Sequence, residues 1–289
     1  MSETQEWTTV IKPKDKLWSV DIKELWKYRD LATLFVKRDI ITQYKQTILG
    51  PMWFFLQPII TVFMYMVVFG GIAGIATDGI PQPLFYLSGT CIWQYFSDCL
   101  NKTSNTFVSN SGLFGKVYFP RLIVPMANVT SNLLRFGIQL SLFIVVYIIY
   151  SIIGCDASVN WYALLFPLLV VMMAGLSLGF GIIISSMTTK YRDLQILFSF
   201  IVHLWMYATP IVYPLSLVKG KIVAGFDMYT IMRLNPVTPV IETFKYGVLG
   251  AGEFIGWGWL AYSFVFMLIL LVLGVVIFNK TQKSFMDTV

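Results

Sequence analysis

The sequence predicts an all-α, polytopic membrane protein with six transmembrane helices, and three observations support this fold class. Hydrophobic residues make up 57% of the 289 residues and charged residues only 12%, whereas soluble domains carry about 25% charged residues. Several apolar windows reach the roughly 20 residues that a membrane-spanning helix needs. The Lys and Arg residues behind the net charge of +6 lie between these windows, so they indicate membrane orientation rather than a nucleic-acid surface.

The N-terminal region is charged and lacks the apolar segment of a cleavable signal. We interpret residues 1–24 as an N-terminal cytoplasmic extension. Residues 25–50 contain no Pro or Gly before Gly50 and mix apolar with charged side chains, which predicts an amphipathic helix at the membrane interface. A solvated cytosolic helix would show the same periodicity. The expected apolar face consists of Leu31, Leu34, Ile41 and Ile48.

The six spans are expected within residues 51–280, as one transmembrane domain followed by a cytoplasmic tail at 281–289. The apolar segments lie at about 52–75, 84–107, 126–150, 161–187, 194–213 and 257–278. Gly50 and Pro51 separate the interfacial helix from the first span. The long connector at 214–256 contains three prolines, yet it stays apolar.

The distribution of basic residues predicts that both termini are cytoplasmic. With the N-terminus inside, sixteen Lys and Arg residues fall in inside segments and four in outside segments. This bias agrees with the positive-inside rule. The four outside residues are Lys219, Lys221, Arg233 and Lys245, all in the connector before the last span.

Three ionisable side chains fall within the predicted spans: Asp98, Arg135 and His203. An Arg about ten residues into a span must find a partner or reach toward the interface, and Asp98 is a candidate partner for Arg135. His203 suits a proton relay. An isolated His in an apolar helix is more often packed and hydrogen-bonded, however, and we favour that role.

No residue pattern indicates catalysis or a metal site. The single His excludes an HExxH motif, and Cys91, Cys99 and Cys155 have no CxxC or metal-ligand spacing. Asp98 is the one carboxylate expected at membrane depth, so there is no second carboxylate to form a general acid–base pair with it. The run 111–116 ends in Gly-Lys but lacks the first Gly and the Ser or Thr of a Walker A loop. We therefore expect a non-catalytic protein without a cofactor or metal of its own.

Aromatic side chains make up 16% of the chain and occur inside spans as well as at their ends. Those at span ends are expected as interfacial belts. Tyr and Trp inside neighbouring spans have flat apolar faces with a polar edge, which suits stacking against sugar rings, although packing in the helix core explains any single one. The candidate sugar contacts of this kind are Trp53, Tyr65, Trp205 and Tyr207.

Ordered motifs along the chain resemble those of one membrane family. They are the runs 25–31 (LWKYRDL), 38–40 (RDI), 44–53 (YKQTILGPMW), 116–121 (KVYFPR), 190–194 (KYRDL), 209–214 (TPIVYP) and 234–236 (LNP). Together they are similar to the permease subunits of polysaccharide ABC exporters, the Wzm-like proteins that export O-antigen, capsule or teichoic-acid chains. The resemblance extends from about residue 22 to the C-terminus.

This resemblance implies roles for three segments. Residues 25–50 would form a gate helix at the cytoplasmic side, and the connector 214–256 would form two short re-entrant helices. The connector near 108–121 would hold a coupling helix that docks on an ATPase through exposed Phe and Tyr rings and basic side chains; an ordinary basic loop is the alternative. The gate-helix residues would be Trp26, Tyr28, Arg29, Arg38, Asp39 and Tyr44. The coupling residues would be Phe114, Lys116, Tyr118, Phe119, Pro120 and Arg121.

The resemblance also implies an assembly and a function. Two copies, a homodimer, would form one channel in the bacterial inner membrane, with two partner subunits that bind ATP and Mg. The expected function is export of a lipid-linked polysaccharide, with O-antigen favoured. Two alternatives stay open: an ABC exporter permease for a drug or lipid, and a gradient-driven transporter without an ATPase. The latter needs a relay of ionisable groups, for which only Asp98, Arg135 and His203 are available.

Overall fold

Helices make up almost all of the structure, a computed structural model that describes residues 22–45, 48–155, 157–191, 193–250, 252 and 254–285. The longer helices are α2 (Arg29–Tyr44), α3 (Trp53–Tyr65), α4 (Gln82–Ser104), α7 (Ile123–Ile153), α8 (Phe166–Thr188), α9 (Leu194–Tyr207), α11 (Thr238–Leu249) and α12 (Trp257–Phe285). The shorter ones are α1 (Ile22–Lys27), η1 (Gly50–Met52), the π-helical η2 (Met66–Ile72), α5 (Thr106–Ser109), α6 (Ser111–Phe114), η3 (Trp161–Leu165), η4 (Leu215–Val218) and α10 (Met228–Leu234). Strands β1 (Ile222–Val223) and β2 (Phe226–Asp227) form a small antiparallel hairpin. The predicted all-α fold class is confirmed.

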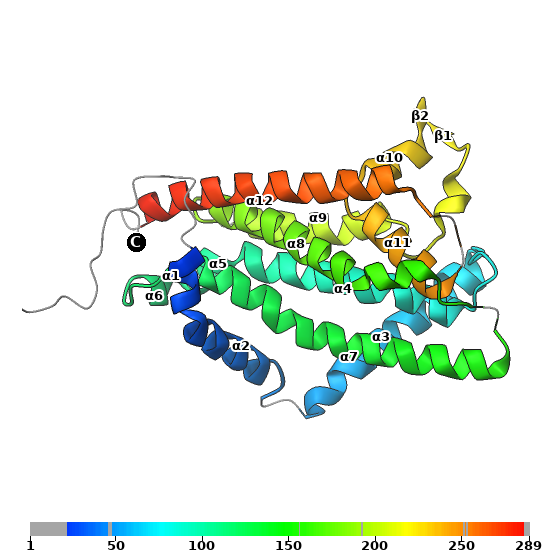
Figure 1. The fold of residues 1–289 in the computed structure, drawn as a ribbon, viewed down its shortest axis with the longest axis horizontal. Helices are drawn as coiled ribbons and strands as arrows, with labels where there is room; N and C mark the ends of the chain where they lie inside the picture. The colour runs from blue at the N-terminus through cyan, green and yellow to red at the C-terminus, as the bar shows by residue number, and fades with distance from the viewer. Residues whose placement is uncertain are drawn as a thin grey trace, which may run out of the picture.

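α4, α7, α8, α9 and α12 extend along the longest axis of the molecule, whereas α2 and α3 cross it at an angle (Figure 1). α1, α5, α6 and the C-terminal part of α12 lie at one end, which we call the α1 end, whereas α10 and the β-hairpin lie at the other, the hairpin end. At each end, a hydrogen bond joins two segments that are far apart in the sequence. Thr188 Oγ1 donates to the carbonyl O of Ser104 at the α1 end (3.1 Å), and Ser216 Oγ donates to Asp78 Oδ1 at the hairpin end (2.8 Å).

Within the described residues, four helical segments are long and apolar enough to cross a membrane: Gly50–Ile72, Ile123–Ile153, Trp161–Thr188 and Trp257–Gln282. The other two predicted spans correspond to α4 and α9. α4 has 23 residues, about 34 Å of helix, but its many polar side chains lower its hydropathy. α9 has 14 residues, about 21 Å of helix, and ends at Tyr207 instead of near Tyr213, because Pro210 cannot continue the helix.

α4 is the central helix of the bundle. Most of its side chains are buried, and it packs against α3, α7, α8 and α11. The polar half of the second predicted span, which lies in α4, is therefore held inside the protein rather than in lipid.

Small residues allow close approach between other helices of the bundle. A Cβ added at Gly274 of α12 would lie 3.1 Å from the carbonyl O of Gly179 on α8.

The N-terminal helical segment is divided where the sequence predicted one continuous helix. α1 begins at Ile22, the chain turns at Tyr28, and α2 ends at Tyr44. Residues 1–21, most of the expected N-terminal extension, lie outside the described part of the chain, as do residues 46 and 47.

The buried face of α2 also differs from the prediction. Phe35 is the buried residue of this helix, whereas Leu34 is 61% exposed and Ile41 is exposed as well. Ile48 lies beyond the helix and is fully exposed. Of the four residues of the expected apolar face, Leu31 alone packs against the buried cluster, so that prediction was wrong. The reason is that α2 packs on α7 and on the connector after α5, which selects a different side of the helix.

The connector before the last span contains two short helices, α10 and α11, as expected. α11 is buried along almost its whole length, but α10 is short and lies beside the exposed hairpin, which the sequence analysis did not predict. α12 continues to Phe285, so the region 281–289 expected as a tail begins inside this helix. Residues 286–289 lie outside the described residues.

Candidate functional site: the polar helix interface and the α1 end

The two oppositely charged residues predicted inside neighbouring spans form an ion pair. Arg135 Nη1 on α7 lies 2.8 Å from Asp98 Oδ2 on α4, and both side chains are mostly buried. An unpaired charge is energetically unfavourable in a membrane-spanning helix, so each residue lowers the free-energy penalty of burying the other. The partner that the sequence offered for Arg135 is confirmed.

Two glutamines extend this ion pair. Arg135 Nη2 donates to Gln57 Oε1 on α3 at 2.6 Å, and Gln94 Nε2 donates to Asp98 Oδ1 at 2.8 Å. Arg135 thereby links α7 to both α3 and α4. The sequence analysis did not single out either glutamine. The available signal was the four-residue spacing of Gln94 and Asp98, which places both on one helix face.

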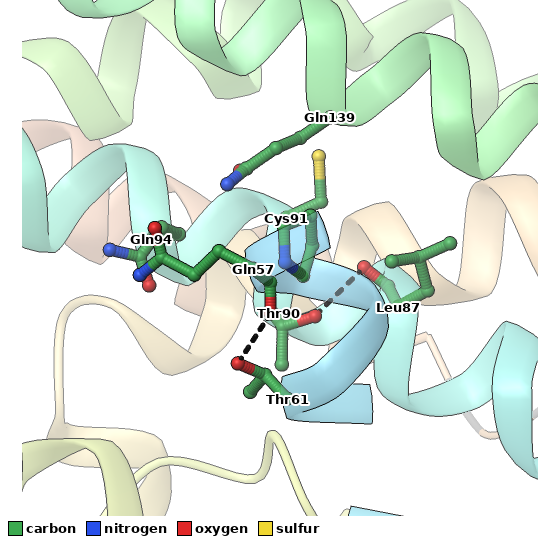
Figure 2. Close-up of a pocket in the computed structure, with 8 residues that line it drawn as sticks. Gln57, Thr61, Leu87, Thr90, Cys91, Gln94 and Gln139 are labelled. Carbon is green, nitrogen blue, oxygen red and sulfur yellow. Dashed lines mark hydrogen bonds between the residues drawn. The ribbon is translucent and has the colours of Figure 1, made fainter. Parts of the chain in front are cut away.

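A small pocket opens beside this network, between α3, α4 and α7 (Figure 2). It encloses about 20 Å³. Its lining residues are Gln57, Pro58, Thr61, Leu87, Thr90, Cys91, Gln94 and Gln139. Most of these were not noticed in the sequence, because single Gln and Thr residues in an apolar run carry little signal.

His203 lies apart from the ion pair, on α9. Its Nδ1 is 2.7 Å from the carbonyl O of Ser199, so the expected hydrogen bond is present. The side chain is exposed in the single chain, and the expectation that it is packed was wrong. Within the described residues, His203 makes no hydrogen bond or ion pair with Asp98 or Arg135, so the three groups do not form a continuous relay.

The segment expected to couple to an ATPase lies at the α1 end, but its two phenylalanines point inward. Phe114 and Phe119 are 4% and 5% exposed, which contradicts the expectation that their rings are free to dock. Phe119 lies 5.8 Å from the ring of Phe35 on α2, and Phe114 lies 5.9 Å from that of Phe107. Phe107 in turn stacks on Phe278 of α12 at 4.6 Å. These rings form an aromatic cluster that joins the connector to α2 and α12.

The exposed part of this segment is Lys116, Val117 and Tyr118, of which Tyr118 is 59% exposed. Pro120 is buried. Arg121 is buried too: its Nη1 donates to the carbonyl O of Gln282 on α12 at 3.1 Å, and its guanidinium lies 5.3 Å from the ring centre of Phe114. Arg121 therefore fixes the segment to α12 instead of presenting its charge to a partner.

The gate-helix residues lie on α1 and α2, mostly at the surface. Arg38 Nη2 lies 2.9 Å from Asp39 Oδ1, and its guanidinium is 4.9 Å from the ring centre of Phe35. The exposed Trp26 lies under the guanidinium of Arg29 at 5.7 Å. Tyr28 is half-buried at the break between the two helices and packs against the aromatic cluster. The side chain of Tyr44 lies outside the described part of the structure.

The four candidate sugar contacts are not gathered on one surface. Trp53 and Tyr207 are exposed, but Tyr65 and Trp205 are half-buried. The Tyr65 hydroxyl donates to Met206 Sδ at 3.4 Å. Trp205 packs edge-to-face against Trp93, Phe96 and Phe180, so its ring already has aromatic neighbours within the chain.

Asn235 joins two of the sequence motifs. Its Oδ1 accepts hydrogen bonds from Trp205 Nε1 and from the backbone N of Val237, both at 3.1 Å. Its Nδ2 donates to Thr209 Oγ1 at 2.9 Å. The runs 209–214 and 234–236 therefore meet where α9 ends and α11 begins, a contact that the sequence did not indicate.

A second ion pair lies in α11, within the connector before the last span. Lys245 Nζ lies 3.6 Å from Glu242 Oε1, and both side chains are under one-tenth exposed. Lys245 Nζ also donates to the carbonyl O of Pro210 at 2.5 Å and lies 4.1 Å from the ring centre of Phe85 on α4. Lys245 is therefore a buried, paired charge rather than a solvated one, and Asp98 is not the only buried carboxylate.

Comparison with known proteins identifies the family. Residues 31–249 match the ABC-2 type transporter. The O-antigen export system permease protein RfbA of Myxococcus xanthus is 28% identical over 225 residues, which cover 78% of this chain and 82% of that protein. An RfbA of Klebsiella pneumoniae is 26% identical over 263 residues (89% and 94%), and the polysialic acid transport protein KpsM of Escherichia coli is 22% identical over 256 residues (87% and 93%).

These relatives confirm the resemblance seen in the motifs. Among the described residues, no group of three or more His, Cys, Asp or Glu side chains is placed to hold a metal ion. The long apolar helices, with a charged network between them, agree with a membrane transporter. Because the family match covers most of the chain, the chain belongs to the ABC-2 type transporter family of membrane proteins.

Proposed function

We propose that this chain is the membrane subunit of an ATP-driven exporter that moves a lipid-linked polysaccharide, of the O-antigen type, across the bacterial cytoplasmic membrane. The observation that carries this proposal is its similarity, over most of both chains, to relatives named as O-antigen export permeases and to a polysialic acid transport protein. The chain itself has no enzymatic role in this scheme, and a separate subunit binds ATP and Mg.

The α1 end is the proposed docking site of the ATPase subunit. Lys116, Val117 and Tyr118 project from the connector while Phe119 and Arg121 anchor it to α2 and α12. An exposed Tyr beside a Lys, on a segment held rigidly from behind, suits insertion into a pocket of a partner. This end is cytoplasmic in the proposal, as the positive-inside count predicts.

A second copy of the chain is the proposed partner within the membrane. Exposed apolar side chains cover α3 and α9, including Phe63, Phe200 and Leu204. Because lipid covers such faces as well as protein does, exposure alone does not assign the interface. The homodimer rests on the resemblance to exporter permeases, with the channel between the two copies.

The test is deletion of the gene in its host. We expect surface polysaccharide to disappear and lipid-linked polymer to accumulate inside the cell. A plasmid copy of the gene should restore export in this strain, but not in a strain that also lacks the ATPase subunit. Unchanged surface polysaccharide, with loss of a drug or lipid export activity instead, would assign the chain to a different ABC exporter. Transport in vesicles without any ATPase would favour a gradient-driven carrier.

A further inference from the structure

The pocket between α3, α4 and α7 is polar in a part of the molecule that is otherwise apolar. None of its lining residues is charged, and five of them carry an amide or a hydroxyl. Its volume of about 20 Å³ is room for one water-sized polar group. Leu87, Cys91 and Pro58 form buried walls, whereas Gln57 lies at the exposed rim. The pocket is therefore open from the side of α3.

Gln139 points into this pocket without a hydrogen-bond partner. It is 4% exposed, and its amide forms no hydrogen bond with any other described residue. Figure 2 shows the side chain reaching from α7 toward Gln57 and Gln94. An amide that faces a pocket and has no partner within the protein is available to bind water or a ligand.

The neighbouring ion pair sets which polar atoms the pocket presents. Gln57 uses its Oε1 to accept from Arg135, which leaves its NH₂ group as a donor. Gln94 uses its Nε2 to donate to Asp98, which leaves its Oε1 as an acceptor. Gln57 is thus oriented with its NH₂ group free and Gln94 with its carbonyl O free. The charges of Arg135 and Asp98 neutralise each other.

The two threonines of the pocket contribute acceptors. Thr61 Oγ1 donates its proton to the carbonyl O of Gln57 at 2.9 Å, and Thr90 Oγ1 donates to that of Tyr86 at 2.7 Å. Because each hydroxyl proton is used by the backbone, the oxygen lone pairs remain for an occupant. The pocket therefore combines acceptors from Thr61, Thr90 and Gln94 with a donor from Gln57.

We propose that this pocket is a binding subsite for one hydroxyl group of a sugar unit in the exported chain. A hydroxyl both donates and accepts, as this set of groups requires, whereas an anion or cation finds no unpaired charge here. The assignment rests on the proposed function, because it is the cargo of a polysaccharide exporter that brings sugar hydroxyls past α3. Water offers the same chemistry from another source, and the experiments separate the two.

The first experiment measures polysaccharide export by full-length variants in the deletion strain, together with the ATPase subunit. Gln139→Leu removes the unpartnered amide at nearly constant volume, and Thr61→Val removes one acceptor. We expect each to slow export about five-fold, the factor for one hydrogen bond of ordinary strength. Thr130→Val is the matched control, because Thr130 also donates to a backbone carbonyl, that of Met126, but is exposed on α7 outside the pocket.

Three results would overturn the subsite in this experiment. Export at the wild-type rate by both pocket variants, at equal amounts in the membrane, removes the pocket from substrate binding. Failure of the wild-type gene itself to restore surface polysaccharide means that the proposed function is wrong, and the subsite with it. Slow export by Thr130→Val as well would show that any lost hydroxyl has this effect.

The second experiment distinguishes sugar from water by thiol labelling. Thr61→Cys is combined with Cys155→Ser and Cys91→Ala, because Cys155 is half-buried and Cys91 lines the same pocket. This variant is labelled with a small hydrophilic methanethiosulfonate in cells that carry an inactive ATPase subunit. Polymer-producing cells are compared with cells unable to synthesise the polymer; Thr90→Cys serves as the second labelled variant. We expect labelling to be about five-fold slower where polymer is present. Equal labelling rates in both strains would mean that water alone occupies the pocket.

Discussion

The guanidinium of Arg135 lies 2.8 Å from the carboxylate of Asp98, and it also binds Gln57 at 2.6 Å. One side chain therefore holds three helices, α3, α4 and α7, at a polar point within their apolar surfaces. α3 has few buried side chains of its own, so this contact adds a polar link to its packing on α4 and α7.

Neutralising one member of the ion pair should destabilise the protein more than neutralising both. In Asp98→Asn or Arg135→Gln a buried charge loses its partner, at about 3 kcal/mol. The double variant Asp98→Asn/Arg135→Gln leaves neither charge and can keep a hydrogen bond. The apparent Tm of the detergent-purified chain checks this. A double variant that is as unstable as the sum of the two single changes would contradict the interpretation.

The same reasoning applies to Lys245 and Glu242 at the hairpin end. Lys245→Met removes the hydrogen bond to Pro210 and leaves the Glu242 carboxylate buried without its cation, so we expect a loss of about 3 kcal/mol. Adding Glu242→Gln should restore part of it. Lys221→Met, at an exposed position near the hairpin, is the control with an unchanged Tm. Equal behaviour of Lys245→Met and Lys221→Met would mean that the buried pair is not formed.

The α1 end offers a direct comparison of an exposed and a buried aromatic residue. Tyr118→Ala should reduce co-purification of the ATPase subunit without changing the Tm of the permease, because the side chain contacts no core. Phe119→Ala should instead lower stability by about 3–5 kcal/mol, since it removes a ring from the cluster with Phe35 and Phe114. If Phe119→Ala lost only the partner and kept its Tm, the buried position of Phe119 would be wrong.

The hairpin end should show a pH dependence that comes from Asp227. Its carboxylate accepts from the Thr230 hydroxyl and from the backbone N–H groups of Tyr229 and Thr230, which lowers its pKa below the ordinary value. A lowered pKa in the folded state means that this cap is fully present above the ordinary Asp pKa. It is lost as the pH falls through the lowered value.

Hydrogen exchange at the Tyr229 and Thr230 amides measures this effect. We expect their protection to fall at acidic pH in the wild type but to be independent of pH in Asp227→Asn, which keeps a capping oxygen without a titrating group. The same acid-induced loss of protection in Asp227→Asn would assign the effect to another residue.

Several features of the fold and site were predictable because their signal is local. Long apolar runs predicted the helices, and mid-span charges predicted that Arg135 needs a partner. The fifth span was predicted to extend to 213, past Pro210, whereas α9 ends at Tyr207 because proline limits a helix before its own position. The motif at 116–121 marked the correct segment while misjudging which of its rings is free.

What the sequence by itself determined was the membrane class, the approximate helices and the family, because hydropathy and motif order are properties of neighbouring residues. Only the tertiary structure decided that Phe119 is covered by Phe35 while Tyr118 is not, and that Lys245 meets the carbonyl of Pro210. Burial and pairing depend on residues far apart in the chain. The role of a polar side chain between apolar neighbours therefore depends on how the helices pack. The amides of Gln57 and Gln94, which are oriented by Arg135 and Asp98, are an example.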